Sequence, residues 1–181
     1  MAIASTDLLF KLSEKSGAAG DTVAGTPAGS LGKYVSTTEI TTATLHNLFD
    51  VVTGDENADS DVEYRCIFIH NNHATLALTA AVVWLSAEVE NGCAVAIAVD
   101  DIAPTAKGQA GAQADEIADE STAPGAGVGA FSSPVSKATG LALGDIPVGY
   151  VQAIWVRRTA ANTAALANDG ATIRVEGNTE P

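Results

Sequence analysis

The chain has 181 residues, which is enough for one domain with its own hydrophobic core. Its 22 acidic and 9 basic residues give a formal charge of −13, which argues against binding to nucleic acid or to an anionic membrane, because both need clustered Lys and Arg. Hydrophobic residues make up 46% of the chain but aromatic residues only 5%, so we expect a core rich in small side chains.

Residues 1–32 are expected to form an N-terminal arm with one short strand at residues 7–13 (DLLFKLS). Residues 17–32 are rich in Gly, Ala, Ser and Thr and show no apolar periodicity. Such a segment buries too little apolar surface to offset its conformational entropy, so we expect neighbouring subunits to hold it. No basic segment precedes the first apolar residues, so we expect no signal peptide and synthesis in a cytoplasm.

Residues 33–181 are expected to form the folded domain. Residues 33–41 (KYVSTTEIT) alternate between apolar and polar side chains, which predicts a strand. Residues 42–52 change to a helical period, carried by Leu45, Leu48, Phe49 and Val52, and predict a short helix. An acidic loop is expected at residues 54–61.

The centre of the predicted domain is residues 62–85. Apolar side chains alternate from Val62 to Phe68 and again from Leu76 to Trp84, with a polar turn between them. We therefore predict a hairpin of two core strands. Both strands are also apolar on their second face, which is typical of strands that are covered on both sides.

The remaining strands follow from the same alternation. Residues 92–100 predict a third core strand with alanines on one side, and residues 101–149 predict long loops with short edge strands. The short ordered stretches are expected at residues 114–118, 128–132 and 141–143, and the last two strands at 150–158 and 171–176. The total of seven to nine strands predicts an all-β sandwich or jelly roll.

One acidic segment has a spacing that could bind Ca²⁺. Asp55, Asn57, Asp59 and Asp61 alternate, and Ca²⁺ prefers several oxygen ligands from one loop. However, Ser60 stands where the bend glycine of such loops is expected, and Cys66 stands where a bidentate Glu is expected. A solvated acidic loop is the favoured interpretation, and Ca²⁺ binding stays open.

The other polar clusters each have a simpler structural explanation. His70 and His73 fit a turn better than a metal site, because two imidazoles alone do not make one; His46 has no partner in the sequence. A second carboxylate cluster is interpreted as a charged loop: Asp115, Glu116, Asp119 and Glu120. The aromatic residues within strands are assigned to core packing: Trp84, Trp155 and Tyr150. Three arginines are expected to form ion pairs within the chain or with a neighbouring chain: Arg157, Arg158 and Arg174.

The two cysteines, Cys66 and Cys93, are expected to be buried free thiols, with a disulfide between them as the alternative. No nucleophile has an adjacent His and acid signature, so enzyme activity is not expected. The sequence therefore predicts no catalytic, cofactor-binding or metal-binding residues and no cofactor.

Several segments resemble a family of small β-sandwich structural proteins of tailed bacteriophages. The resemblance is carried by STTEI (36–40), LFDVVTGDENADSDVEYRCIFIHN (48–71), ATLALTAAVVWLSA (74–87), the 115–149 region, YVQAIWVRRT (150–159) and IRVEG (173–177). It does not extend to the residues before Lys33. The resemblance implies a virion component and leaves open whether this component belongs to the head or the tail.

The acidic composition favours a place on the outside of the particle, away from packaged DNA. The leading expectation is therefore a head decoration, or cement, protein in the virion that binds the major capsid protein and copies of itself as a homo-oligomer. The alternatives are a tail or baseplate structural protein and a carbohydrate-binding module of a fibre. The first would be present in tens of copies or fewer, and the second should present exposed aromatic side chains.

Overall fold

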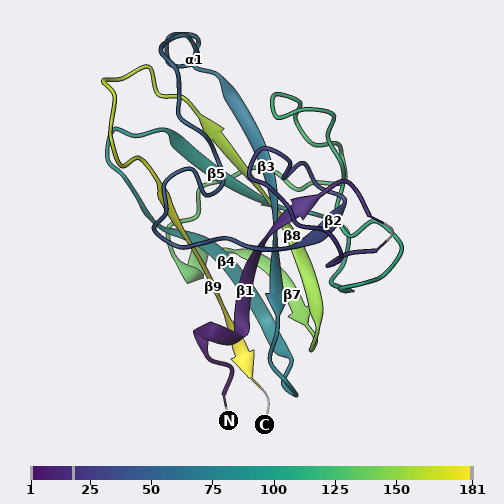
Figure 1. Ribbon diagram of the computed structural model, residues 1–181. Helices are drawn as coiled ribbons and strands as arrows, with labels where there is room; N and C mark the ends of the chain where they lie inside the picture. Colours follow the sequence, from purple (N-terminus) through teal and green to yellow (C-terminus); the bar gives the residue numbers. More distant parts are fainter. Residues whose placement is uncertain (1, 18, 180–181) are drawn as a thin grey trace.

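The computed structural model describes residues 2–17 and 19–179, and within them nine strands form two antiparallel sheets (Figure 1). The large sheet has the order β2-β1-β3-β8-β5, with β6 also paired to β8, and the small sheet has the order β7-β4-β9. In chain order the elements are η1 (Ser5–Asp7), β1 (Leu8–Glu14), β2 (Tyr34–Glu39), α1 (Gly54–Asp59), β3 (Val62–Asn71), β4 (Leu78–Glu88), β5 (Ala94–Val99), β6 (Thr105–Ala106), η2 (Lys137–Thr139), β7 (Leu141–Ile146), β8 (Tyr150–Thr159) and β9 (Ala171–Thr179).

The prediction of an all-β sandwich is confirmed. The strands expected at residues 7–13, 33–41, 92–100, 150–158 and 171–176 correspond to β1, β2, β5, β8 and β9. Within the described residues, no helix has both the length and the apolar character needed to cross a membrane.

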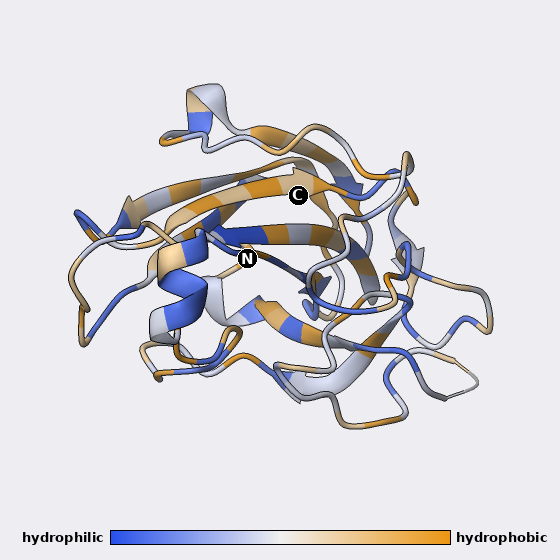
Figure 2. Cartoon of the chain, turned by 90° about the horizontal axis from the view of Figure 1, so that it is seen from above, coloured by the Kyte–Doolittle hydropathy of each residue, from blue (hydrophilic) through white to orange (hydrophobic). Residues whose placement is uncertain are grey.

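The large sheet is apolar on both faces because both faces are covered. Its inner face packs against the small sheet, with Ile67 and Ile154 meeting Val83 and Leu85 in one buried cluster. Its outer face carries Phe68 and Trp155 in a second buried cluster, which loop residues such as Ala114 and Ile117 cover. The view from above shows apolar residues concentrated along the strands (Figure 2). The expectation that both faces of the two central strands are covered is confirmed for β3, whereas on β4 Ala80 is exposed and Val82 half-buried.

The predicted hairpin at residues 62–85 is wrong, although both of its strands exist. β3 pairs with β1 and β8 in the large sheet, and β4 pairs with β7 and β9 in the small sheet. Asn71, at the end of β3, donates from Nδ2 to the carbonyls of Leu76 and Ile146, both at 2.9 Å, and so fixes the chain where it crosses between sheets. Alternation identifies a strand but does not identify its partner.

The helix predicted at residues 42–52 is also absent; the segment is a series of turns and bends. Ala43 and His46 have left-handed backbone angles, with φ of 57° and 59°, which a right-handed helix cannot contain. Its apolar residues have different environments: Leu48 is buried in the core, whereas Leu45 is 58% exposed.

The helix instead occupies the predicted acidic loop, as α1. Thr53 caps it by accepting from the Glu56 N–H, and Glu56 reaches back to the Thr53 N–H. This reciprocal pair is a capping box, which the T-x-x-E spacing of the sequence encodes. The expectation of an acidic loop at residues 54–61 is therefore wrong for residues 54–59, which are helical, although they remain at the surface.

The glycine-rich segment at residues 19–32 lies against the large sheet. Backbone hydrogen bonds join Asp21 to Val35, Thr37 to Val23 and Cys66 to Ser30. β1 is an inner strand, paired on one side with β2 and on the other with β3. The short ordered stretches expected between residues 101 and 149 also appear, as bridges at Glu116, Val128 and Ser132 and as β7.

Candidate docking groove

The small sheet covers only part of the inner face of the large sheet, and a groove of about 1100 Å³ opens beside it. Its floor includes Phe10 of β1, Ile67 of β3 and Val156 of β8, which are inward-facing residues of the large sheet. Two irregular segments, residues 42–54 and 161–170, form its walls.

Large apolar side chains are exposed around this groove. Leu45 is 58% exposed, Val51 63%, Val89 39% and Leu166 43%, and all four line it. In the described part of the chain, only two further large apolar residues are exposed, Val135 and Val148, and neither lines the groove. A contiguous exposed apolar patch is typical of an interaction site, whereas single exposed residues are ordinary.

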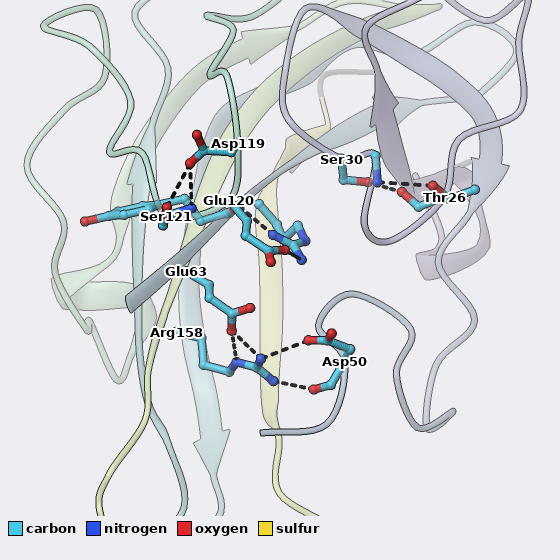
Figure 3. Close-up of polar contacts among 11 residues, drawn as sticks. Thr26, Ser30, Asp50, Glu63, Asp119, Glu120, Ser121 and Arg158 are labelled. Carbon is cyan, nitrogen blue, oxygen red and sulfur yellow. Dashed lines mark hydrogen bonds and ion pairs between the residues drawn. The ribbon is translucent and has the colours of Figure 1, made fainter. Parts of the chain in front are cut away.

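A charged network anchors one wall of the groove to β8 (Figure 3). Arg158 donates from Nε to the Glu63 carboxylate at 2.6 Å and from Nη1 to the Asp50 carbonyl at 2.5 Å. The guanidinium carbons of Arg158 and Arg65 lie 4.8 and 5.4 Å from the centre of the Phe49 ring. Burial raises the pKa of Glu63, although its bond to Arg158 opposes this change. The network holds residues 49–50 in place.

Cys93 also lines the groove, and both cysteines are free. Burial, together with the neighbouring Asp169 carboxylate, raises the pKa of the Cys93 thiol to about 11. Cys66 is fully buried, and burial raises its pKa well above the ordinary value. The expected burial is therefore complete for Cys66 and partial for Cys93, and the thiol of Cys93 is poorly suited to nucleophilic chemistry at neutral pH.

Among the described residues, one set of three acidic groups has oxygen atoms close enough to hold a cation: Asp100, Asp101 and Asp115, all within 4.8 Å of one another. Asp100 is buried, and burial raises its pKa. Its Oδ2 accepts from the Trp155 indole and from the Asp115 N–H, both at 2.9 Å. The Asp100 carboxylate thus already has hydrogen-bond donors from the protein. These bonds hold the covering loop at Asp115 against the outer face of the large sheet.

The segment that suggested Ca²⁺ does not bring its oxygens together. Asp55, Asn57 and Asp59 lie on α1, and Asn57 donates to the Thr163 carbonyl at 2.9 Å. Positions two apart on a helix point in different directions. This helix contributes acidic charge beside the groove, where Gly54 and Asn57 line the wall.

The three histidines lie in separate environments. His73 Nδ1 accepts from the N–H groups of Thr75 and Leu76, at 3.1 and 2.9 Å, which is a turn contact. His70 is buried, and its ring nitrogens have no hydrogen-bond partner among the described residues. Burial, with Lys107 and Lys11 nearby, lowers the pKa of His70 to about 4. His46 is in the groove wall.

The second carboxylate cluster is spread over several partners. Glu116 pairs with Lys15 and Lys33, at 3.3 and 3.4 Å, and Glu120 pairs with the buried Arg65. Asp119 accepts from the side chains of Ser121 and Thr122, both at 2.8 Å, and these bonds lower its pKa (Figure 3). The interpretation as a surface loop is confirmed for Asp119, whereas Glu120 also neutralises a buried cation.

The strand aromatics pack in or against the core, and of the three predicted arginines only Arg158 forms an ion pair among the described residues. Trp84 and Trp155 are buried, which confirms core packing, and Tyr150 is half-buried. Arg158 pairs within the chain, Arg157 stacks on Phe131 at 5.3 Å, and Arg174 is exposed on β9.

Neither the groove nor the network of Arg65 and Arg158 was predicted from the sequence. The only signal for the network was Glu63 and Arg65 inside an otherwise apolar strand, because a charge in such a place requires a partner. No protein-family model, curated protein or solved structure matches this chain.

Proposed function

We propose that this chain is a structural component of a bacteriophage virion, and specifically a decoration protein that binds the outside of the assembled head. The observation that carries the proposal is the apolar groove with its four exposed large side chains. A protein that binds a lattice needs such a surface, because removing apolar area from water drives association.

Two further features support this role. The formal charge of −13 suits a position outside the capsid, away from packaged DNA. The resemblance of residues 36–40, 48–71, 74–87 and most later segments to phage structural proteins points the same way. Copies of the chain would occupy equivalent positions on the lattice, and we propose that neighbouring copies contact one another.

The test uses particles of the phage that encodes this chain, purified after deletion of its gene. Purified protein should sediment with these particles and saturate at hundreds of copies per particle. A Leu166→Glu variant should lose this binding, because it places a carboxylate at the mouth of the apolar groove.

Val135→Glu is the matched control. Val135 is 71% exposed but lies outside the groove, so this variant should sediment like the unmodified protein. The proposal is wrong if the unmodified protein stays in the supernatant. The assignment to the groove is wrong if both variants lose binding equally.

A further inference from the structure

The small sheet has an unpaired edge at β9 in the part of the chain that the structure describes. β9 pairs with β4 along one side, and the sheet order ends there. An unpaired edge presents a row of free N–H and C=O groups, which can pair with a strand from another chain. The groove begins at this edge, because Gly170 to Ile173 line it.

The hydrogen bonds of β9 show which backbone groups are free. Just before β9, the Gly170 carbonyl accepts from the Val89 N–H at 3.0 Å. Leu85, the β4 partner of Ile173, donates its N–H to the Pro134 carbonyl at 2.8 Å instead of to β9. Because backbone direction alternates along a strand, Thr172 and Arg174 also face β4. The N–H and C=O groups of Ile173 and Val175 therefore point to the free edge.

The same residues carry apolar side chains that are only half-covered. Ile173 and Val175 pack against the core from β9, and Leu8 and Phe10 do so from β1. All four remain partly exposed, and Ile173, Leu8 and Phe10 line the groove. An added strand would cover these side chains while its backbone paired with β9.

The charge of the groove defines what this strand must carry. Its lining includes the acidic residues Glu39, Asp50 and Asp169, and its only Arg or Lys among the described residues is Arg158. Arg158 is already paired with Glu63 and Asp50. Glu39 and Asp169 therefore carry the net charge of the lining, which favours a cationic occupant; repulsion disfavours a second copy of this chain, with its charge of −13, as the occupant of this groove.

We infer that the groove and the free edge of β9 receive an extended segment of the partner protein, with alternating apolar and basic side chains, as a fourth strand of the small sheet. This inference rests on the proposed function, since the partner is the lattice protein. Backbone pairing would supply affinity, and the alternating side chains would supply specificity.

The test uses the purified chain and an eight-residue capped peptide of alternating Lys and Val. We expect it to bind and to slow hydrogen exchange at the amides of Ile173 and Val175. The amides of Thr172 and Arg174 already face β4, so their exchange should not change. Two controls should bind roughly tenfold more weakly or worse: a peptide with Glu in place of Lys, and one N-methylated on alternate residues.

Failure to bind, or equal binding of either control peptide, would overturn the inference, as would binding that leaves exchange at Ile173 and Val175 unchanged. The sedimentation assay reports separately on the proposed function. A chain that binds the peptide along β9 but does not sediment with particles contradicts the function alone. A chain that sediments with particles but fails the peptide test contradicts the strand addition alone.

Discussion

His70 is 1% exposed, and neither of its ring nitrogens has a hydrogen-bond partner among the described residues. A buried imidazole in this setting must stay neutral, because burial and the nearby cations Lys107 and Lys11 disfavour a further positive charge. His70 therefore makes the stability of the fold depend on pH.

The pKa of His70 is about 4 in the folded chain and is expected near its ordinary value of 6.5 after unfolding. Between these values the unfolded chain binds the extra proton. The contribution of His70 to the free energy of unfolding is therefore fully present above pH 6.5 and is lost as the pH falls toward 4. The loss should approach about 3 kcal/mol in the free energy of unfolding. Urea denaturation at pH 7.5 and pH 4.5 measures it.

A His70→Leu variant is the control, because it removes the titration of His70 and leaves all other titratable side chains in place. The difference in free energy of unfolding between the unmodified chain and the variant should be smaller at pH 4.5 than at pH 7.5, or should reverse in favour of the variant. Parallel pH profiles for the two proteins would show that His70 does not titrate in this way.

Arg158 and Glu63 form a pair that is almost fully buried, at 8% exposure for each residue. An Arg158→Met variant leaves the Glu63 carboxylate without its main partner and should lower the free energy of unfolding by about 3 kcal/mol at pH 7. A double variant with Glu63→Gln should recover much of this loss, because no buried charge remains. Chemical denaturation of the unmodified chain, of each single variant and of the double variant gives the coupling energy between Arg158 and Glu63. A coupling energy near zero would contradict the pairing.

At the scale of elements, Gly32 connects the N-terminal segment to the loop that covers the large sheet. It has a φ of +94° and forms a bridge with Glu116. A Cβ atom at this position would lie 1.8 Å from the Asp115 carbonyl oxygen, which belongs to the backbone. Only glycine fits there without moving the loop.

A Gly32→Ala variant should therefore lose about 3 kcal/mol of stability, since both the conformation and the space exclude a side chain. Gly54→Ala is the matched control: Gly54 begins α1, and a Cβ there would meet no atom within 4 Å. This control should stay within about 1 kcal/mol of the unmodified chain. Thermal unfolding compares them, and equal losses would contradict the account of Gly32.

The elements differ in how far the sequence could predict them. Alternation in β3, β4, β5 and β8 was strong enough to place these strands, because their side chains face a core on at least one side. The crossing of the chain at Asn71 could not be predicted, since it depends on a contact with the Ile146 carbonyl, 75 positions further along the chain, as well as on the nearby Leu76 carbonyl. α1 was missed, although its capping box was readable at Thr53 and Glu56.

The groove could not be predicted for a related reason. It exists because the large sheet is wider than the small one, and this difference depends on which strands pair. Its exposed residues Leu45 and Val51 occur in a segment whose apolar spacing suggested a helix. The left-handed backbone angles of Ala43 and His46 prevent this helix, and no pattern in the sequence indicates them.

At the scale of the whole molecule, the chain combines an acidic surface with one large apolar groove beside an unpaired strand edge. In the proposed strand addition, the acidic charge disfavours a second copy as the occupant of the groove and favours a cationic segment. Binding through these features should weaken as salt concentration rises, because the attraction between partially exposed charges is screened.

The most direct test of the proposed function is the number of copies of the chain in each purified virion of the phage that we propose encodes it. Quantitative mass spectrometry against the major capsid protein measures this ratio. The account predicts one copy for every one to few capsid subunits, hence hundreds per particle. A few copies per hundred capsid subunits would contradict the head assignment and favour the tail, and absence from the virion would contradict a structural role altogether.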